Sequence, residues 1–479
     1  MPSRYRRLLL LVLSLLLGLR TAPGRAQSLD LPDDTDRQQA RGAWLPGFGH
    51  GFVVQTAIRR GAVPAGRFGT GVRLLLIDST VGRRPTDSVW LAGPCTPLFA
   101  AAGKQHVLYR FRRLKTDTMI SVVADARGRI LTVKRQLHGT DKTWDYLTLP
   151  HPRDGFVLAN EGARNRHLWV RYLRPDLTEA WVWNVPATEG RVQLDAYAAD
   201  AERLWLVVTD DAADHRKATS SAICLDLLTG RELTRIPLDQ AGKTHRFVTA
   251  CAPDGTGGLL VAGQAFDERR PRPDHDGELY VQRLQPDGSR QPETRLTLGR
   301  RLPHHLHWQH VQPLPDGGVR LIGETYTSTS RLAHHARAIS TALLTVGRFT
   351  LSFTTLRPRG LVLADLTPAG AMGQLRTLDL PDGGKFTAGG YWPARTLAVA
   401  ATQAGAMQWR GPTPDRQALL IRSAHRIQRV SLADWSTQTL ATTGRKNSLD
   451  VWGFPRSDGP PLLLEYVRRP RATRVFYPR

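Results

Sequence analysis

Four histidines lie within seven residues of this chain, and their spacing could support metal binding. They are His304, His305, His307 and His310. If the segment is a β-strand, side chains alternate, so that His305, His307 and Gln309 share one face while His304 and His310 share the other. Two imidazoles on one strand face can bind Zn²⁺ or Cu²⁺, but a stable site needs a third or fourth ligand.

A third ligand could come from His245. When "LHWQHVQPLPDG" and "THRFVTACAPDG" are aligned on Asp-Gly, His307 falls where His245 lies. We therefore predict a ligand-binding site at His245, His305 and His307, with His305 and His307 as the metal ligands. The alternative is that these residues belong to a polar inner strand and hydrogen-bond to neighbouring repeats.

Other motifs indicate little chemistry. "DHDGE" places Asp274, His275, Asp276 and Glu278 together and could bind Ca²⁺, although it lacks the full calcium-loop spacing and could equally be a solvated turn. The chain has no glycine-rich nucleotide loop and no Gly-x-Ser-x-Gly elbow. We name no catalytic residue and expect no cofactor, apart from the zinc or calcium considered above.

Repeated hairpins are the elements that would position these residues. One unit appears as "MISVVADARGRILTVKRQL", "SAICLDLLTGRELTRIPL" and "ELYVQRLQPDGSRQPETRL", with turn glycines at Gly128, Gly230, Gly288 and later Gly370. A second hairpin precedes it, as in "HRFVTACAPDGTGGLLVAGQAF". Four short strands recurring roughly every 40–50 residues are typical of a β-propeller. We predict an all-β propeller of about seven four-stranded blades, with six or eight as alternatives.

The turn sequences also carry a resemblance. "DGTGGLLVAG", "DGGVRLIGE" and "GLVLADLTPAG" resemble the Asp-Gly-Gly-type propeller repeats of exported proteins of Gram-negative bacteria. The clearest copies cover residues 245–380. The resemblance implies a propeller fold, and it does not imply an activity, since one fold serves many functions.

The chain is expected to be exported and to form a single domain. Residues 1–26 have a basic start, an apolar run and small residues, which is the pattern of a signal peptide, and no second long apolar run follows. We expect a linker at 27–45 and one propeller over 46–479, with insertions at 267–278 and 328–358. The last blade would be completed by an N-terminal strand such as "HGFVVQTAIRR".

Charge and cysteine content limit the partners. The net charge is +24, but 58 of the 66 basic residues are arginines spread along the chain, without a basic stripe or a nucleic-acid-binding motif. We expect an envelope protein or an acidic or carbohydrate ligand as partner, and no nucleic acid. Of three cysteines, Cys224 and Cys251 could pair, or all could be buried thiols.

The sequence therefore favours a non-enzymatic function. We expect a periplasmic or secreted scaffold that binds a ligand or partner through one rim of the propeller. The alternative is a propeller hydrolase or lyase with its active site at the central channel. An enzyme would require ionisable groups that converge on one pocket.

Overall fold

The structure is a computed structural model, and the residues it describes contain β-strands and no helix. They are residues 28–32, 39–45, 50–59, 69–78, 83–92, 95–113, 118–137, 147–149, 154–161, 167–186, 190–212, 219–239, 245–266, 278–297, 305–328, 353–380, 386–389, 408–412, 417–422, 425–444, 448–453, 461–468 and 471–477. Within them, no helix is long and apolar enough to cross a membrane.

The described strands form eight antiparallel sheets, which are the blades of a β-propeller. The first four blades contain the following strands. Blade 1 has β2 (Gln39–Leu45), β3 (His50–Arg59), β4 (Gly69–Asp78) and β5 (Arg83–Ala92). Blade 2 has β6 (Cys95–Ala102), β7 (His106–Arg113), β8 (Thr118–Asp125) and β9 (Ile130–Leu137). Blade 3 has β10 (Leu147–Leu149), β11 (Phe156–Glu161), β12 (His167–Leu173) and β13 (Glu179–Pro186). Blade 4 has β14 (Gly190–Ala199), β15 (Arg203–Ala212), β16 (Thr219–Asp226) and β17 (Glu232–Pro237).

The remaining blades follow the same order along the chain. Blade 5 has β18 (His245–Pro253), β19 (Leu259–Phe266), β20 (Glu278–Leu284) and β21 (Thr294–Leu296). Blade 6 has β22 (His305–Pro313), β23 (Val319–Ser328), β24 (Phe353–Leu366) and β25 (Met372–Asp379), with β26 (Phe386–Gly389) added. Blade 7 has β27 (Gln408–Pro412), β28 (Ala418–Arg422), β29 (Arg426–Ser431) and β30 (Thr437–Thr442). Blade 8 has β31 (Ser448–Gly453), β32 (Leu462–Arg468), β33 (Arg471–Phe476) and β1 (Ser28–Pro32).

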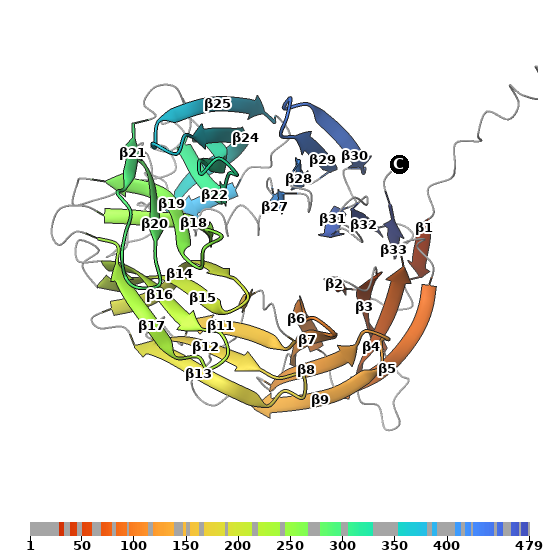
Figure 1. The fold of residues 1–479 in the computed structure, drawn as a ribbon. Helices are drawn as coiled ribbons and strands as arrows, with labels where there is room; N and C mark the ends of the chain where they lie inside the picture. Colours follow the sequence, from red (N-terminus) through yellow and green to blue (C-terminus); the bar gives the residue numbers. More distant parts are fainter. Residues whose placement is uncertain are drawn as a thin grey trace, which may run out of the picture.

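Figure 1 shows the eight sheets arranged around a central axis, with the first strand of a blade nearest the centre and the fourth at the periphery. The prediction of an all-β propeller is confirmed, and the number of sheets lies at the upper end of the predicted range. Contacts between β14 and β18, and between β18 and β22, join the inner strands of neighbouring blades. The first strands therefore surround the axis.

The ring is closed by the N-terminal strand β1, which pairs with β33 from Ser28 opposite Phe476 to Pro32 opposite Ala472. Closure of the last blade by an N-terminal strand was expected, but the strand was wrong. The segment "HGFVVQTAIRR" contains β3, the second strand of blade 1. Residues 27–45, expected to be a linker, contain β1 and β2. β1 has only five residues and its partner lies at the other end of the chain, so no local signal indicates it.

The turn between the third and fourth strands has the same geometry in several blades. Gly128, Gly230, Gly288 and Gly370 all have a positive φ, between 71° and 88°, which a glycine adopts without steric strain. Blade 3 has Leu177 at this position (φ 64°). In the same turns, carboxylates accept backbone N–H bonds, as Asp226 does from Leu228 and Thr229. This explains the recurrence of Asp and Gly in the sequence.

The core consists of apolar clusters that lie between consecutive blades. Blades 3 and 4 share one that includes Trp181 and Trp183, blades 4 and 5 a second, and blades 5 and 6 a third. Similar clusters join blades 1 and 2, 2 and 3, 6 and 7, and 7 and 8. Both faces of most blades are therefore buried, and a polar side chain on such a face requires a partner or a function.

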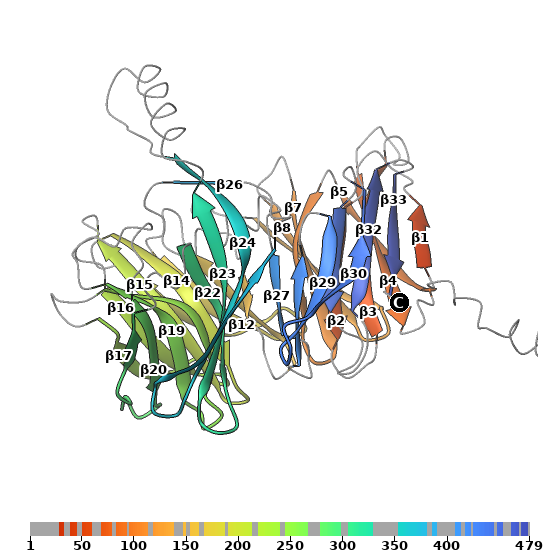
Figure 2. The same cartoon turned by 90° about the horizontal axis from the view of Figure 1, so that it is seen from above.

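Blade 6 departs from the regular pattern. β24 is 14 residues long. Its C-terminal part pairs with β25, and residues Phe353–Leu356 pair with β26. Figure 2 shows the N-terminal end of β24, which pairs with β26, reaching beyond the strands of blades 4 and 5. The insertion expected at 328–358 therefore begins and ends within strands, since Ser328 pairs with Leu356. Residues 329–352 and 267–277 lie outside the described residues.

Candidate functional site

The structure places the three predicted histidines on inner strands of adjacent blades. His245 is the first residue of β18 and pairs with Phe266, and His305 is the first residue of β22 and pairs with Tyr326. The structural equivalent of His245 is thus His305, and the alignment of His245 with His307 was wrong. The turns 254–258 and 314–318 have equal length. Asp-Gly begins the first turn but lies in the middle of the second, so aligning the two segments on Asp-Gly shifts the preceding strands by two residues.

His307 is buried within blade 6 with 5% of its surface exposed, and its Nδ1 lies 2.9 Å from the carbonyl oxygen of Trp308. Its cross-strand partner is Glu324, which is 1% exposed and accepts a hydrogen bond from the hydroxyl of Tyr326. Directly paired residues share one face of a sheet. An acidic residue therefore lies on the same face as the imidazole, which the sequence did not indicate.

A β-bulge changes the expected alternation in β22. The register shifts between Trp308 and His310, so that His310 pairs with Ile322. Ile322 and Glu324 are two residues apart and lie on the same face, which packs against blade 7 through Ile322. His307 and His310 therefore share this face, whereas strict alternation had placed them on opposite faces. A bulge inserts one residue and reverses the alternation beyond it.

A metal site remains a prediction for these histidines. Among the residues that the structure describes, no group of three or more His, Cys, Asp or Glu side chains could hold a metal ion. The structure does not describe the side chains of His245 and His305, nor residues 274–276 of the calcium candidate. Glu278 is described, and its carboxylate accepts a hydrogen bond from Thr297 and lies 3.8 Å from Arg295.

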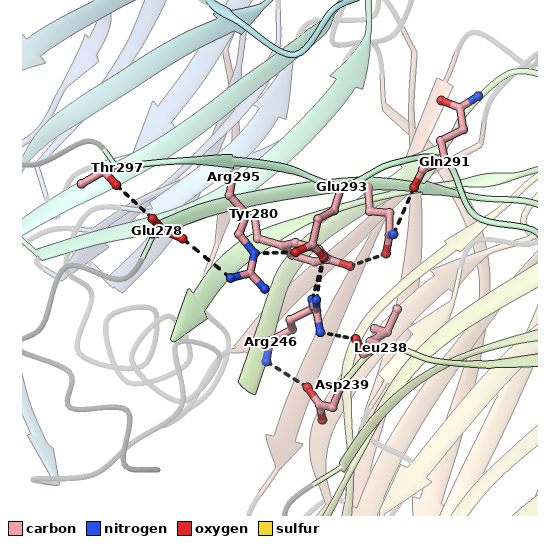
Figure 3. Close-up of polar contacts among 10 residues, drawn as sticks. Leu238, Asp239, Arg246, Glu278, Tyr280, Gln291, Glu293, Arg295 and Thr297 are labelled. Atoms are coloured by element: carbon pink, nitrogen blue, oxygen red, sulfur yellow. Dashed lines mark hydrogen bonds and ion pairs between the residues drawn. The ribbon is translucent and has the colours of Figure 1, made fainter. Parts of the chain in front are cut away.

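A charged network surrounds Arg246, the residue after His245. Its guanidinium donates to Glu293 Oε2 from Nε (3.0 Å) and NH2 (2.7 Å), and from NH1 to the carbonyl oxygen of Leu238 (2.6 Å). The guanidinium also lies 5.4 Å from the centre of the Tyr280 ring. Figure 3 shows Arg246 pointing toward Glu293, with Arg295 and Glu278 continuing the chain of charges.

This network links two blades. Leu238 and Asp239 follow β17 of blade 4, and the Asp239 carboxylate accepts from the backbone N–H groups of Ser220 and Arg246. Charges alternate in sign along Arg246, Glu293, Arg295 and Glu278, and hydrogen bonds surround the buried guanidinium. Such a neutralised network stabilises a buried charge, so we assign it a structural role between blades 4 and 5.

A cavity of about 200 Å³ lies between blades 2 and 3, and its lining has more cationic than anionic side chains. Its lining contains three cationic side chains and one carboxylate, together with two polar and two apolar residues: Arg110, Lys134, Arg171, Glu179, Ser121, Gln136, Leu173 and Leu177. The formal charge of the lining is therefore positive. Among the sites described here, this cavity is the one most suited to a charged ligand.

The blade 2 wall is one row of residues across the sheet. Arg110 on β7 pairs with Ser121 on β8, which pairs with Lys134 on β9. Arg110 is 2% exposed, Ser121 is also buried, and Arg110 Nε donates to Ser121 Oγ at 3.1 Å. Lys134 is exposed. The row thus runs from Arg110, which is buried at the floor of the cavity, to Lys134 at its open side.

Blade 3 supplies the opposite wall. Arg171 lies on β12 and is half-buried, and its NH1 is 3.9 Å from a carboxylate oxygen of Glu179. Lys134 crosses between the blades, because its Nζ donates to the carbonyl oxygen of Leu177 at 3.1 Å. The side chains of Leu173 and Leu177 are buried and give this wall an apolar part. Donors therefore approach the cavity from two different sheets.

Blades 3 to 6 have apolar residues where blade 2 has Arg110 and Ser121. The turns after the third strand align the blades, and the equivalent second- and third-strand pairs are Ala159–Val170, Val207–Ala222, Ala262–Val281 and Ile322–Leu363 in blades 3 to 6. All eight residues are buried. Blades 3 to 6 are thus apolar at this position, whereas blade 2 has a polar pair and blade 7 has Arg422 opposite Ile427.

The chemistry of the cavity is that of anion binding. Guanidinium and ammonium groups donate to carboxylate, sulfate or phosphate oxygens, and partial burial strengthens these contacts. Sequence reasoning missed this site, although "HVLYRFRR" contained a signal. Val107, Tyr109 and Phe111 alternate with Leu108, Arg110 and Arg112. In a strand buried on two faces, both alternating sets are ordinarily apolar, so the arginines in this segment were the signal.

The three cysteines are free thiols, so the possible pairing of Cys224 with Cys251 is absent and the favoured alternative of unpaired cysteines holds. Cys224 and Cys251 both contact the apolar cluster between blades 4 and 5. Burial raises the pKa of Cys224 to about 12, so this thiol stays protonated at neutral pH and is a poor nucleophile.

Comparisons with known proteins find similarity to solved structures alone. No protein-family model matches the chain, and no curated protein matches it. An oligogalacturonate lyase in complex with manganese is 11% identical with a TM-score of 0.44, over 92% of this chain and 99% of the lyase chain. The WD40 domain of SCAP from fission yeast is 8% identical with a TM-score of 0.42, over 94% and 98% of the two chains.

A third similar structure is the β-propeller domain of the Trilobed protease from Pyrococcus furiosus. It is 8% identical with a TM-score of 0.39, and the match covers 85% of this chain and 96% of that chain. The assignment of the fold rests on the eight sheets of the chain itself, and these similarities contribute no functional argument.

Proposed function

We propose that the protein is a non-enzymatic β-propeller that binds an acidic ligand in the cavity between blades 2 and 3. One observation carries the proposal: the pair Arg110–Ser121 replaces apolar residues that blades 3 to 6 retain at the same position, and Lys134 extends this polar row. The cationic groups of this row can donate hydrogen bonds to an anion between the blades, and partial burial strengthens such contacts.

The proposal is tested by titrating the protein calorimetrically with acetate, inorganic phosphate, sulfate and phenyl phosphate, with glycerol as a neutral control. At least one anion should bind with one site per chain. Lys134→Gln should weaken that binding about tenfold, as expected for a lost hydrogen bond to a charged group. Lys134 is exposed, so this variant should fold normally.

Arg135→Gln is the matched control. Arg135 is the next residue on β9 and is also exposed, but it pairs with Ile120 and points to the opposite face of the sheet. The net charge changes equally in both variants. Equal loss of affinity in the two variants, or no binding of any anion, would show that the cavity is not the site.

We also propose that the protein is exported to the periplasm or the medium, on the basis of the N-terminal signal pattern. Intact-mass measurement of protein from its native host should show a chain that begins near Ala26. A mass that retains residues 1–25 would contradict export by a cleaved signal.

A second candidate function is a hydrolase or lyase with its site near the axis. It is favoured by the arrangement of His307, Glu324 and Tyr326, which places an imidazole and a buried carboxyl group on one face of blade 6. Such a pair could act as acid and base. Release of product from polysaccharide or peptide substrates by the wild type, abolished in Glu324→Gln, would support the enzyme over the scaffold.

A further inference from the structure

The outer strand of blade 3 has the features of a site to which another strand can be added. Among the described strands, β13 (Glu179–Pro186) pairs with β12 alone, and Figure 1 places it at the periphery of its blade. Its register with β12 is regular from Trp181 to Pro186. An edge strand presents a row of backbone N–H and C=O groups that can pair with an extended peptide.

Other outer strands carry features that oppose such pairing. β5, β9, β17 and β25 each contain charged residues, β21 and β1 have only three and five residues, and β30 consists mainly of Thr and Gln. Charges and short length are the usual protection of a sheet edge. From Ala180 to Val185, β13 reads "AWVWNV", without a charged residue, Pro or Gly, so this protection is missing.

Two tryptophans hold β13 in place from the side of blade 4. Trp181 Nε1 donates to the carbonyl oxygen of Leu227 at 3.1 Å, and Trp183 Nε1 donates to Glu232 Oε2 at 3.2 Å. Both side chains are buried in the apolar cluster between blades 3 and 4. A partner strand would therefore meet an edge that is already ordered, which lowers the entropic cost of binding.

The other face of β13 indicates the charge of the partner. Val182 is 40% exposed and is paired with Arg171, which lines the gap between blades 2 and 3. A residue opposite Val182 on an added strand would share this face. Across the gap, β9 contains Lys134 and no acidic residue, and Lys134 Nζ reaches the carbonyl oxygen of Leu177 on blade 3. Asp or Glu opposite Val182 would therefore point toward a cation.

Charge also decides between a second copy of this chain and a different partner. The chain has a formal net charge of +24. Two copies paired through β13 would bring like charges together, whereas an acidic protein would be attracted to the same surface. Charge complementarity thus favours an acidic partner.

We infer that β13 binds an extended segment of an acidic partner protein by strand addition, with carboxylates at alternate positions directed toward the blade 2 side. The inference goes beyond the proposed function, because it uses the backbone edge of β13 and a protein partner, and the small-anion cavity is not required.

Peptide binding measured by fluorescence anisotropy tests the mode and the charge. A labelled peptide TVEVEVT should bind at least about tenfold more tightly than TVKVKVT, and at least about tenfold more tightly than TVEVEVT whose central amide nitrogens are methylated. Methylation keeps the carboxylates and removes the N–H groups needed for strand pairing. Equal binding of the methylated peptide would overturn strand addition, and equal binding of TVKVKVT would overturn the acidic partner.

Val182→Glu tests the position of the added strand. It places a carboxylate where the peptide's carboxylates should lie, so affinity for TVEVEVT should fall at least about tenfold. Thr439→Glu is the matched control, because Thr439 is also exposed on an outer strand, β30 of blade 7, and the change in charge is the same. Equal affinities of Val182→Glu and the control would overturn the placement on β13.

Hydrogen exchange of the wild type gives an independent measurement that needs no variant. TVEVEVT should slow amide exchange in residues 180–185 and leave residues 437–442 of β30 unchanged. Unaltered exchange in 180–185 at saturating peptide would overturn the inference. If acetate, phosphate or sulfate binds the cavity and TVEVEVT does not bind, strand addition fails and the proposed function stands. The opposite result would leave strand addition in place without the cavity site.

Discussion

Glu293→Gln is predicted to destabilise the protein, because it removes the charge that compensates buried Arg246. The Arg246 side chain is 2% exposed and Glu293 is 20% exposed. Two of the guanidinium contacts, at 3.0 and 2.7 Å, go to one carboxylate oxygen of Glu293, and a third goes to the carbonyl oxygen of Leu238. After the substitution, the buried charge would keep only neutral acceptors.

The magnitude follows from the burial of the pair. Removing one partner of a buried ion pair costs about 3–5 kcal/mol. Glu293 is partly exposed and glutamine keeps one acceptor oxygen, so we expect about 3 kcal/mol, the lower end of that range. The expected change is a lower free energy of unfolding, arising at the boundary between blades 4 and 5.

Urea unfolding followed by tryptophan fluorescence measures this change as a shift of the midpoint. Glu202→Gln is the control, because Glu202 is 73% exposed and lies 3.9 Å from Arg203, and exposed pairs contribute about 0–1 kcal/mol. The double substitution Arg246→Met with Glu293→Leu should recover most of the lost stability. A loss below about 1 kcal/mol in Glu293→Gln would refute the argument that this charge stabilises buried Arg246.

Three further predictions concern single positions. Hydrogen bonds from Ser431 and Ser436 lower the pKa of Asp434 to about 2. Its charge therefore stabilises the fold above about pH 4, and this contribution is lost as the pH falls through about 2. The stability difference between wild type and Asp434→Asn, measured by thermal unfolding, should shrink over that interval, and a constant difference would contradict the pKa shift. A Cβ at Gly263 would lie 1.8 Å from the carbonyl oxygen of Phe247, so Gly263→Ala should destabilise the protein by about 1–3 kcal/mol or more. Gly444→Ala is the control: no atom lies within 4 Å of its Cβ, so it should have little effect on the unfolding midpoint. If His305 and His307 bind a metal ion, protein stripped and reloaded with zinc should retain about one ion per chain, and equal retention by the His305→Ala/His307→Ala variant would exclude these ligands.

The architecture was largely predictable because it depends on local sequence patterns. Alternating apolar residues and turn glycines such as Gly230 recur in each hairpin, and each reports a backbone geometry that depends on a few neighbouring residues. The number of blades was less certain. β1 is a five-residue strand whose partner, β33, lies at the other end of the chain, and no local signal indicates such a pairing.

The histidine site shows how a small backbone irregularity changes a prediction. Alternation along β22 correctly identified a strand, but the bulge after Trp308 moved His310 to the face of His307. The alignment on Asp-Gly likewise placed His245 two positions from its structural equivalent. Bulges and turn registers depend on the strand opposite, so the sequence of one strand does not define them.

The sequence by itself determined the all-β repeat, the turn geometry and the excess of positive charge. Only the tertiary structure decided which charges meet. Arg110 and Lys134 are brought into one row by strand register, and Arg171 is placed opposite them by the packing of two blades. The Arg246 and Glu293 pair is likewise formed across distant segments. Side-chain alternation is a property of one strand, whereas the sign and balance of charge in a cavity depend on which faces the folded chain sets against each other.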